Sequence, residues 1–219
     1  PGLRDMKFEF DQETHIGKVD GIVWPSVTQL LNEFKLIDFT DVPPATLENK
    51  RVLGTRIHAA TKLLDDCNLD EEHFNSAFPE CIPYLEAYRK FRVIEKFDPA
   101  DKIGRLLSTK WKFHGEPDEY GVHMTVMGGV PSLIDYKCSW RMYESTGPQL
   151  SGYEILIAEC LKIKIKKRWG LLLKPTGHYD LVPFNDPSDK QDFLACLWLW
   201  WQRCNKYATL NPYKSIKEK

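Results

Sequence analysis

The sequence predicts an α/β (α+β) fold in which helices flank one central mixed β-sheet. Helical patterns come first, a run of short strands follows, and the chain closes with a helix, a hairpin and another helix. The 219 residues are 42% hydrophobic and 28% charged, which suffices for a continuous core. Neither a repeat nor a Gly-, Ser- or Pro-rich linker divides the chain. We therefore interpret residues 1–219 as a single domain.

Alternating apolar residues and a helix-capping motif predict the first elements of the chain. Because the chain opens at Pro1 rather than Met, we interpret residues 1–5 as a cloning remnant. Residues 6–23 alternate loosely around Gly17, which predicts an N-terminal hairpin before a core of residues 24–207. Ser26 and Gln29 have the spacing of a capping box and predict the start of a helix.

Two further helices precede the strands. The first is predicted over 48–64, with Ile57 on its apolar face and His58 at the edge of that face. The second is predicted over 79–93. We expect the acidic stretch 65–72 between them to be a solvated loop.

The second half of the chain predicts a meander and then mixed elements. Strands are expected over 106–113, 124–126 and 130–138, because these β-forming runs are separated by Gly-rich turns. A helix is expected from Pro148 to residue 161. A hairpin is expected from strands 166–173 and 179–184, and residues 208–219 form a tail. Between them, a helix over 188–207 carries five prominent apolar residues: Phe193, Leu194, Leu197, Trp198 and Trp201.

Composition narrows the function classes. Thirty basic and thirty-one acidic residues give a net charge of −1, so the total charge does not indicate a polyanionic partner. The longest apolar run, 193–201, is too short to span a bilayer, and the N-terminus lacks the apolar stretch of a secretory signal. We expect a cytoplasmic protein with no membrane partner. Six cysteines lack metal-site spacing, so we expect no zinc, no iron–sulfur cluster, and reduced, mostly buried thiols.

The residues with the clearest chemistry are Asp118, Asp135 and Lys137. On a strand, Asp135 and Lys137 point to the same side, about 7 Å apart. If a neighbouring strand brings Asp118 beside them, two carboxylates repel unless a divalent cation accepts both. Oxygen ligands favour Mg²⁺ or Mn²⁺, and an adjacent lysine can activate water for phosphodiester hydrolysis. The alternative is an ordinary Asp–Lys pair at the end of a surface strand.

Four motifs in order resemble the PD-(D/E)xK nuclease superfamily, in the branch of RecB-type nuclease domains and phage exonucleases. Pro117-Asp118 matches PD, and 135–137 matches (D/E)xK. Segment 54–58 resembles the histidine motif, and 149–153 resembles QxxxY. The end of the likeness is 171–179 with the helix after it. The resemblance implies a restriction-endonuclease-like core and a metal-dependent DNA nuclease, an exonuclease of phage-type recombination or repair.

The resemblance also implies roles. Mg²⁺, for which Mn²⁺ would substitute, would be held by Asp118, Asp135, the main-chain carbonyl of Tyr136, and His58. Lys137 would activate the attacking water, and Gln149 and Tyr153, one turn apart on a helix, would position the phosphate. From the residues alone, Gln149 and Tyr153 also fit an ordinary amphipathic helix, and His58 fits a hydrogen-bonded core residue.

One departure from the family concerns a glutamate. Members of the phage type have a Glu near where this sequence has 103–105, and Glu95, Asp101 and Glu116 are the nearby acids that could substitute. The missing acid leads to a rival function, a cleavage-deficient nucleic-acid-binding module on the same fold. A third hypothesis is a hydrolase of sugar or nucleotide phosphates, which would turn over small molecules without DNA.

Substrate contacts are expected in a basic segment. It contains Lys162, Lys164, Lys166, Lys167 and Arg168. These residues would track phosphates, or else protect a solvated sheet edge. Trp111, Trp140 and Tyr143 either stack on bases or belong to the core. The expected partners are linear duplex or single-stranded DNA, a single-strand annealing protein and further copies of the chain, in a host cytoplasm if the gene is from a phage.

Overall fold

A mixed sheet forms the centre of the fold, as predicted, and it has five strands in the described residues. The computed structural model describes residues 6–37, 42–100, 104–125 and 129–208, without side chains for 205–208. The strand order is β10 (Tyr179–Pro183), β9 (Lys167–Leu173), β8 (Val130–Lys137), β7 (Glu119–His123) and β4 (Phe97–Pro99). Strands β8 and β9 are parallel, and the other neighbours are antiparallel.

The N-terminal hairpin is extended by a third strand. Strands β1 (Phe8–Asp11), β2 (Ile16–Val19) and β3 (Ile22–Trp24) form an antiparallel sheet of their own. Helix α1 (Val27–Glu33) begins with the predicted capping box. Ser26 Oγ accepts from the Gln29 amide at 3.1 Å, and Gln29 Oε1 accepts from the Ser26 amide at 2.9 Å.

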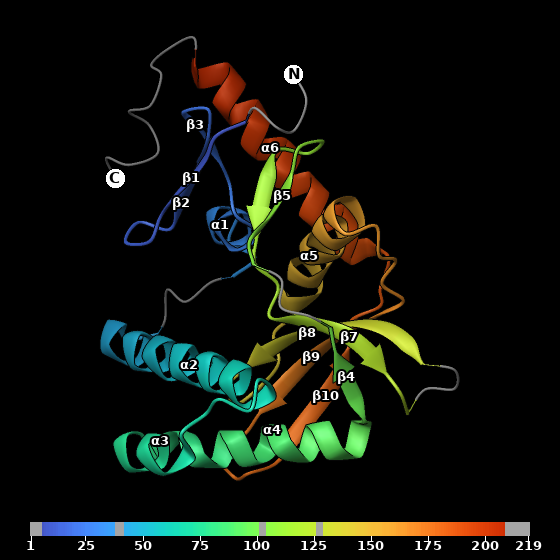
Figure 1. Ribbon diagram of the computed structural model, residues 1–219. Coiled ribbons are helices and arrows are strands. Elements are labelled where there is room, and N and C mark those ends of the chain that lie inside the picture. Colours follow the sequence, from blue (N-terminus) through green and yellow to red (C-terminus); the bar gives the residue numbers. More distant parts are fainter. Residues whose placement is uncertain (1–5, 38–41, 101–103, 126–128, 209–219) are drawn as a thin grey trace.

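Helices cover both faces of the central sheet (Figure 1). One face carries α2 (Pro44–Asp65) and α4 (Ile82–Glu95), joined by α3 (Glu71–Ala77) and the short turn η2 (Pro79–Cys81). The other face carries α5 (Thr146–Cys160), and α1 and α6 (Ser188–Ala208) pack against α5. Strand β8 contributes to both cores, because Ile134 and Tyr136 face the α2–α4 side while Leu133 faces the α5 side.

Several element predictions were wrong in detail. The strand expected over 106–113 is a separate hairpin, β5 (Leu106–Ser108) and β6 (Phe113–Gly115), with a turn between them. The strand expected over 124–126 is instead β7, which ends at His123; Val126 lies outside the described residues. Residues 115–121 were expected to be a turn because of their Gly and Pro, but residues 119–121 belong to β7, whose pairing with β4 and β8 overrides that weak local preference.

The acidic stretch is not a loop throughout. Asp65 is the last residue of α2, and Asp70 caps α3 by accepting from the His73 amide at 3.0 Å. In α6, Phe193 and Leu197 are buried, whereas Trp198 is 61% exposed and the neighbouring Trp200 is buried.

The thiols are also less buried than expected. Only Cys81 and Cys196 are buried among the six free cysteines, and Cys67 and Cys160 are exposed. No helix in the described part of the chain is long and apolar enough to cross a membrane.

Candidate active site

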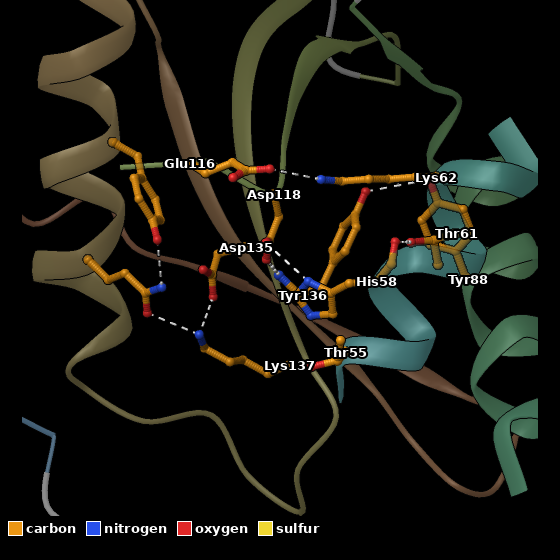
Figure 2. A network of polar contacts seen from close by, with 12 residues as sticks. Thr55, His58, Thr61, Lys62, Tyr88, Glu116, Asp118, Asp135, Tyr136 and Lys137 are labelled. Carbon is orange, nitrogen blue, oxygen red and sulfur yellow. Dashed lines mark hydrogen bonds and ion pairs between the residues drawn. The ribbon is translucent and has the colours of Figure 1, made fainter. Parts of the chain in front are cut away.

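The site lies where β7 begins and β8 ends. Antiparallel pairing places Glu119 opposite Ile134, and continuing this register by one residue places Asp118 opposite Asp135. Because side chains alternate along β8, Asp135 and Lys137 project toward α5, while Tyr136 projects toward α2. The structure therefore brings together two acids that are 17 residues apart in the sequence and the lysine two residues after the second acid (Figure 2).

Asp118 is held by two hydrogen-bonding groups. Its Oδ1 lies 3.1 Å from His58 Nδ1 on α2, and its Oδ2 accepts from the Tyr136 amide at 2.7 Å. Burial alone would raise the pKa of Asp118, but the imidazole of His58 and then the ammonium of Lys137 hold it below the ordinary value. Asp118 is therefore an ionised carboxylate with a fixed orientation.

Asp135 and Lys137 form a buried ion pair. The Asp135 side chain is 2% exposed, and its Oδ2 lies 2.6 Å from Lys137 Nζ without hydrogen-bond geometry to any group in the described residues. Burial raises the pKa of Asp135 to about 6; Lys137 opposes the rise and Asp118 adds to it. Burial would lower the pKa of Lys137, but Asp135 and Asp118 hold it above its usual value. Lys137 is thus an ammonium in this arrangement.

Gln149 and Tyr153 extend this pair across α5. Lys137 Nζ donates to Gln149 Oε1 at 3.0 Å, and Gln149 Nε2 donates to Tyr153 Oη at 3.3 Å. Both side chains are buried. A Cβ on Gly115 would lie 2.9 Å from the Tyr153 ring, so the absence of a side chain there lets β6 pass close to the phenol. The i, i+4 spacing places both polar groups on one face of α5, where Gln149 links Tyr153 to the lysine.

A cleft of about 470 Å³ opens onto Asp118 between α2 and the segment before β7. Its α2 wall is formed by Gly54, Thr55, His58, Ala59 and Lys62. A Cβ on Gly54 would meet no atom, so the wall is open there. Glu116 and Pro117 line the opposite wall. Glu116 lies 3.6 Å from Lys62 (Figure 2) and 3.3 Å from Arg105.

A buried polar network holds α2 and α4 behind the site. Asp65, expected in a solvated loop, pairs with Arg92 and accepts from the hydroxyl of Tyr88. Tyr88 Oη also lies 3.3 Å from Glu119 Oε2 and 3.5 Å from the Tyr136 hydroxyl. Burial and then the charge of Asp65 raise the pKa of Glu119 to about 8. The network joins the end of α2 to the residue next to Asp118.

The side chains at the site fit Mg²⁺ better than a metal ion whose ligands all come from the protein. In 6–37, 42–100, 104–125 and 129–208, no three His, Cys, Asp or Glu side chains converge as a metal site. Mg²⁺ is usually bound through one or two carboxylates and completes its shell with water and substrate phosphates. The facing carboxylates of Asp118 and Asp135, the latter with a buried oxygen lacking a hydrogen bond, match that pattern.

Most of the basic segment lies at the other end of the sheet. Lys162, Lys164, Lys166 and Lys167 are exposed, but residues 162–166 are not in a strand. Lys167 pairs with Ser132, whereas Leu172 pairs with Lys137, so five residues, about 16 Å, separate the segment from the site. Lys162 Nζ donates to the Glu159 carbonyl at the end of α5.

Arg168 does not belong with these lysines. It is 6% exposed, and its guanidinium donates to Ser151, to the Asp186 carbonyl at 2.9 Å and to Asp189 at 3.1 Å. These contacts commit the donors of Arg168 inside the protein, which sets it apart from the exposed lysines of the segment.

The three acids that could replace the missing glutamate differ in where they lie relative to the cleft. Glu95 binds His123 at 3.0 Å and Tyr179 at 3.0 Å, at the end of β7 far from Asp118. Asp101 lies outside the described residues. Of the three, only Glu116 is shown at the cleft.

Trp111, Trp140 and Tyr143 are exposed, so of the two alternatives for these aromatics the structure excludes the core. Trp140 is 79% exposed, and Trp111 and Tyr143 are each 39% exposed.

Sequence reasoning missed two cations that contact Glu116, of which Lys62 lines the cleft. Lys62 lies four residues after His58, so helical spacing already places both on one face of α2. Arg105 reaches Glu116 from the residue before β5. No comparable sequence signal indicated Arg105, because its position depends on the pairing of β5 with β6.

No protein-family model matches the sequence, and no curated protein matches it. Eighteen chains of solved structures do match. One, from Eubacterium rectale, carries the name "putative exonuclease"; it shares 12% identity, with a TM-score of 0.46. The match covers 70% of this chain and 65% of that chain, so this chain spans just under two thirds of its length.

Proposed function

We propose that this protein is a metal-dependent DNA nuclease that hydrolyses phosphodiester bonds. The observation that carries the proposal is the convergence of Asp118, Asp135 and Lys137 at one edge of the sheet, with Lys137 bonded to Gln149. A structural ion pair would not require a second carboxylate opposite the first. The facing acids cost stability in the metal-free protein, which is typical of a site built for a cation.

Asp118 and Asp135, with the Tyr136 carbonyl, would hold Mg²⁺ or Mn²⁺. Bound there, the ion would supply Lewis-acid stabilisation of the phosphate and a water of lowered pKa. His58 orients Asp118 by its bond to Oδ1 and completes the proposed ligand set.

Lys137 and α5 would handle the phosphate and the water. As an ammonium, Lys137 donates to a phosphate oxygen or orients the attacking water; it becomes a base only when the charge of both carboxylates is offset. Gln149 fixes the lysine, and Tyr153 fixes Gln149. The finer proposal, an exonuclease of phage-type recombination, is supported by the order of the four sequence motifs.

The test is Mg²⁺-dependent degradation of linear DNA by wild type, Asp118→Ala and Lys137→Ala. We expect losses of at least about 100-fold in both variants. Glu72→Gln and Lys18→Met, at exposed positions away from the cleft, are the matched controls and should keep the wild-type rate. Equal rates in all five proteins would refute the assignment.

A second function is favoured by one observation, the lack of a third converging acid in the described residues. A cleavage-deficient binding module would bind DNA in a salt-dependent manner and would show no turnover with Mg²⁺ or Mn²⁺. The same time courses, run with both ions, separate the two functions.

A further inference from the structure

Glu116 lies between two cations at the mouth of the cleft. Its Oε1 is 3.6 Å from Lys62 Nζ on α2, and its Oε2 is 3.3 Å from Arg105 Nη2, which approaches from the residue before β5. Figure 2 shows the contact between Glu116 and Lys62 directly above Asp118 and His58. The carboxylate therefore joins the two walls of the cleft, two residues from the proposed metal ligand.

Arg105 is fixed independently of Glu116. Its guanidinium stacks 3.7 Å over the ring of Phe10, in the N-terminal sheet, and Nη1 donates to His114 Nδ1 at 3.1 Å. The stacking and this hydrogen bond hold the guanidinium plane, so Nη2 would stay in place if Glu116 left. Lys62 is likewise placed by the helix, one turn after His58.

The contacts of Glu116 are those that a phosphate group would make. An ammonium and a guanidinium facing one anionic group are the usual protein ligands of a phosphate diester. Glu116 and Lys62 are each about 40% exposed, and ion pairs this exposed are weak. A substrate anion can therefore replace the carboxylate at little cost.

We propose that Glu116 occupies, in the free protein, the place of a backbone phosphate of the DNA, and that Lys62 and Arg105 bind that phosphate once Glu116 turns outward. The proposal rests on the nuclease function and adds to it the contacts that seat the strand next to the scissile phosphate. The cleft of about 470 Å³ has the volume of a small-ligand site, which suits one nucleotide unit.

Because of their charges, removing Glu116 should affect DNA affinity in the opposite direction from removing Lys62 or Arg105. Removing the carboxylate in Glu116→Gln takes away one negative charge a few ångströms from the bound phosphate, so affinity should rise about fivefold at low salt. Lys62→Met and Arg105→Met should weaken binding, and each should make the slope of log Kd against log[salt] shallower by about 0.9 on duplex DNA.

The experiment measures fluorescence anisotropy of a labelled linear duplex in EDTA, between about 50 and 200 mM KCl. The proteins are wild type, Glu116→Gln, Lys62→Met, Arg105→Met and the exposed control Lys18→Met. Tighter binding by Glu116→Gln, together with a shallower slope for Lys62→Met, supports the proposal. Lys62 decides the result if Arg105→Met fails to fold, because Lys62 is partly exposed.

Two results would overturn the proposal. One is unchanged or weaker binding by Glu116→Gln. The other is loss of Mg²⁺-dependent cleavage by Glu116→Gln at saturating DNA with unchanged affinity, which would assign Glu116 to the metal. Failure of the nuclease function is a separate result: wild type would then cleave nothing with Mg²⁺, while the metal-free binding series would still decide the role of Glu116.

Discussion

Replacing Arg168 by methionine should make the protein easier to unfold without weakening the binding of the protein to DNA. The guanidinium joins β9 to α5 through Ser151 and to α6 through Asp189, and it also binds the Asp186 carbonyl. Asp189 has a side chain only 14% exposed, and burial raises its pKa even with Arg168 present. Truncating the arginine leaves that carboxylate without its cation.

The magnitude follows from this burial. Breaking a buried ion pair by removing one partner costs about 3–5 kcal/mol; since Asp189 keeps some solvent contact, we expect about 3 kcal/mol. For a chain of this size, that loss lowers Tm by roughly 6–12 °C. The assay is urea unfolding of wild type, Arg168→Met and Lys167→Met, with DNA binding measured on the folded proteins.

Lys167 is the matched control because it is the exposed neighbour on the same strand. Lys167→Met should change the free energy of unfolding by no more than about 0.5 kcal/mol. If Arg168→Met unfolds like wild type but loses DNA affinity, the buried role of Arg168 is refuted and the original expectation of a phosphate contact is restored.

Two further variants probe how α5 is held. Glu159→Gln should destabilise by about 1 kcal/mol at neutral pH, since the carboxylate accepts hydrogen bonds from the β5–β6 turn. Burial would raise the pKa of Glu159, but these hydrogen bonds outweigh it and hold the pKa below 4.5. The stability difference between variant and wild type should therefore be full above pH 4.5 and disappear as acid protonates the folded carboxylate. Thermal melts across that pH range check it. Gly152→Ala should destabilise by about 1–2 kcal/mol in urea titrations, because its Cβ would lie 2.7 Å from the Phe193 ring; a stabilised variant would contradict that packing.

The central sheet could be predicted because its signals are local. Strand 130–138 is rich in β-forming residues, and its alternation already placed Asp135 and Lys137 on one face. The capping box at Ser26 is likewise contained in four residues and appears as expected. Strand β7 was missed because its pairing partners, which lie on other strands, outweigh its own weak preference.

Within the site, residue spacing predicted which side chains share a face of a helix or strand, but not which groups they contact. The i, i+4 rule brought Gln149 and Tyr153 together, and the structure adds that Gln149 in turn accepts from Lys137. The composition of the basic segment could not reveal that Arg168 is buried, since its acceptors come from α5 and α6. The contact of Glu116 with Lys62 and Arg105 joins three elements, so it depends on tertiary packing alone.

The central claim is that Asp135 and Lys137 act as one catalytic unit with a divalent cation. The most direct measurement is a double-mutant cycle of Mg²⁺-dependent cleavage rates, with Asp135→Asn, Lys137→Met and the combined variant at saturating DNA. Residues that act as a unit are not additive, so the combined variant should lose about as much as either single one, at least about 100-fold. Cleavage at the wild-type rate by all three variants would contradict the account.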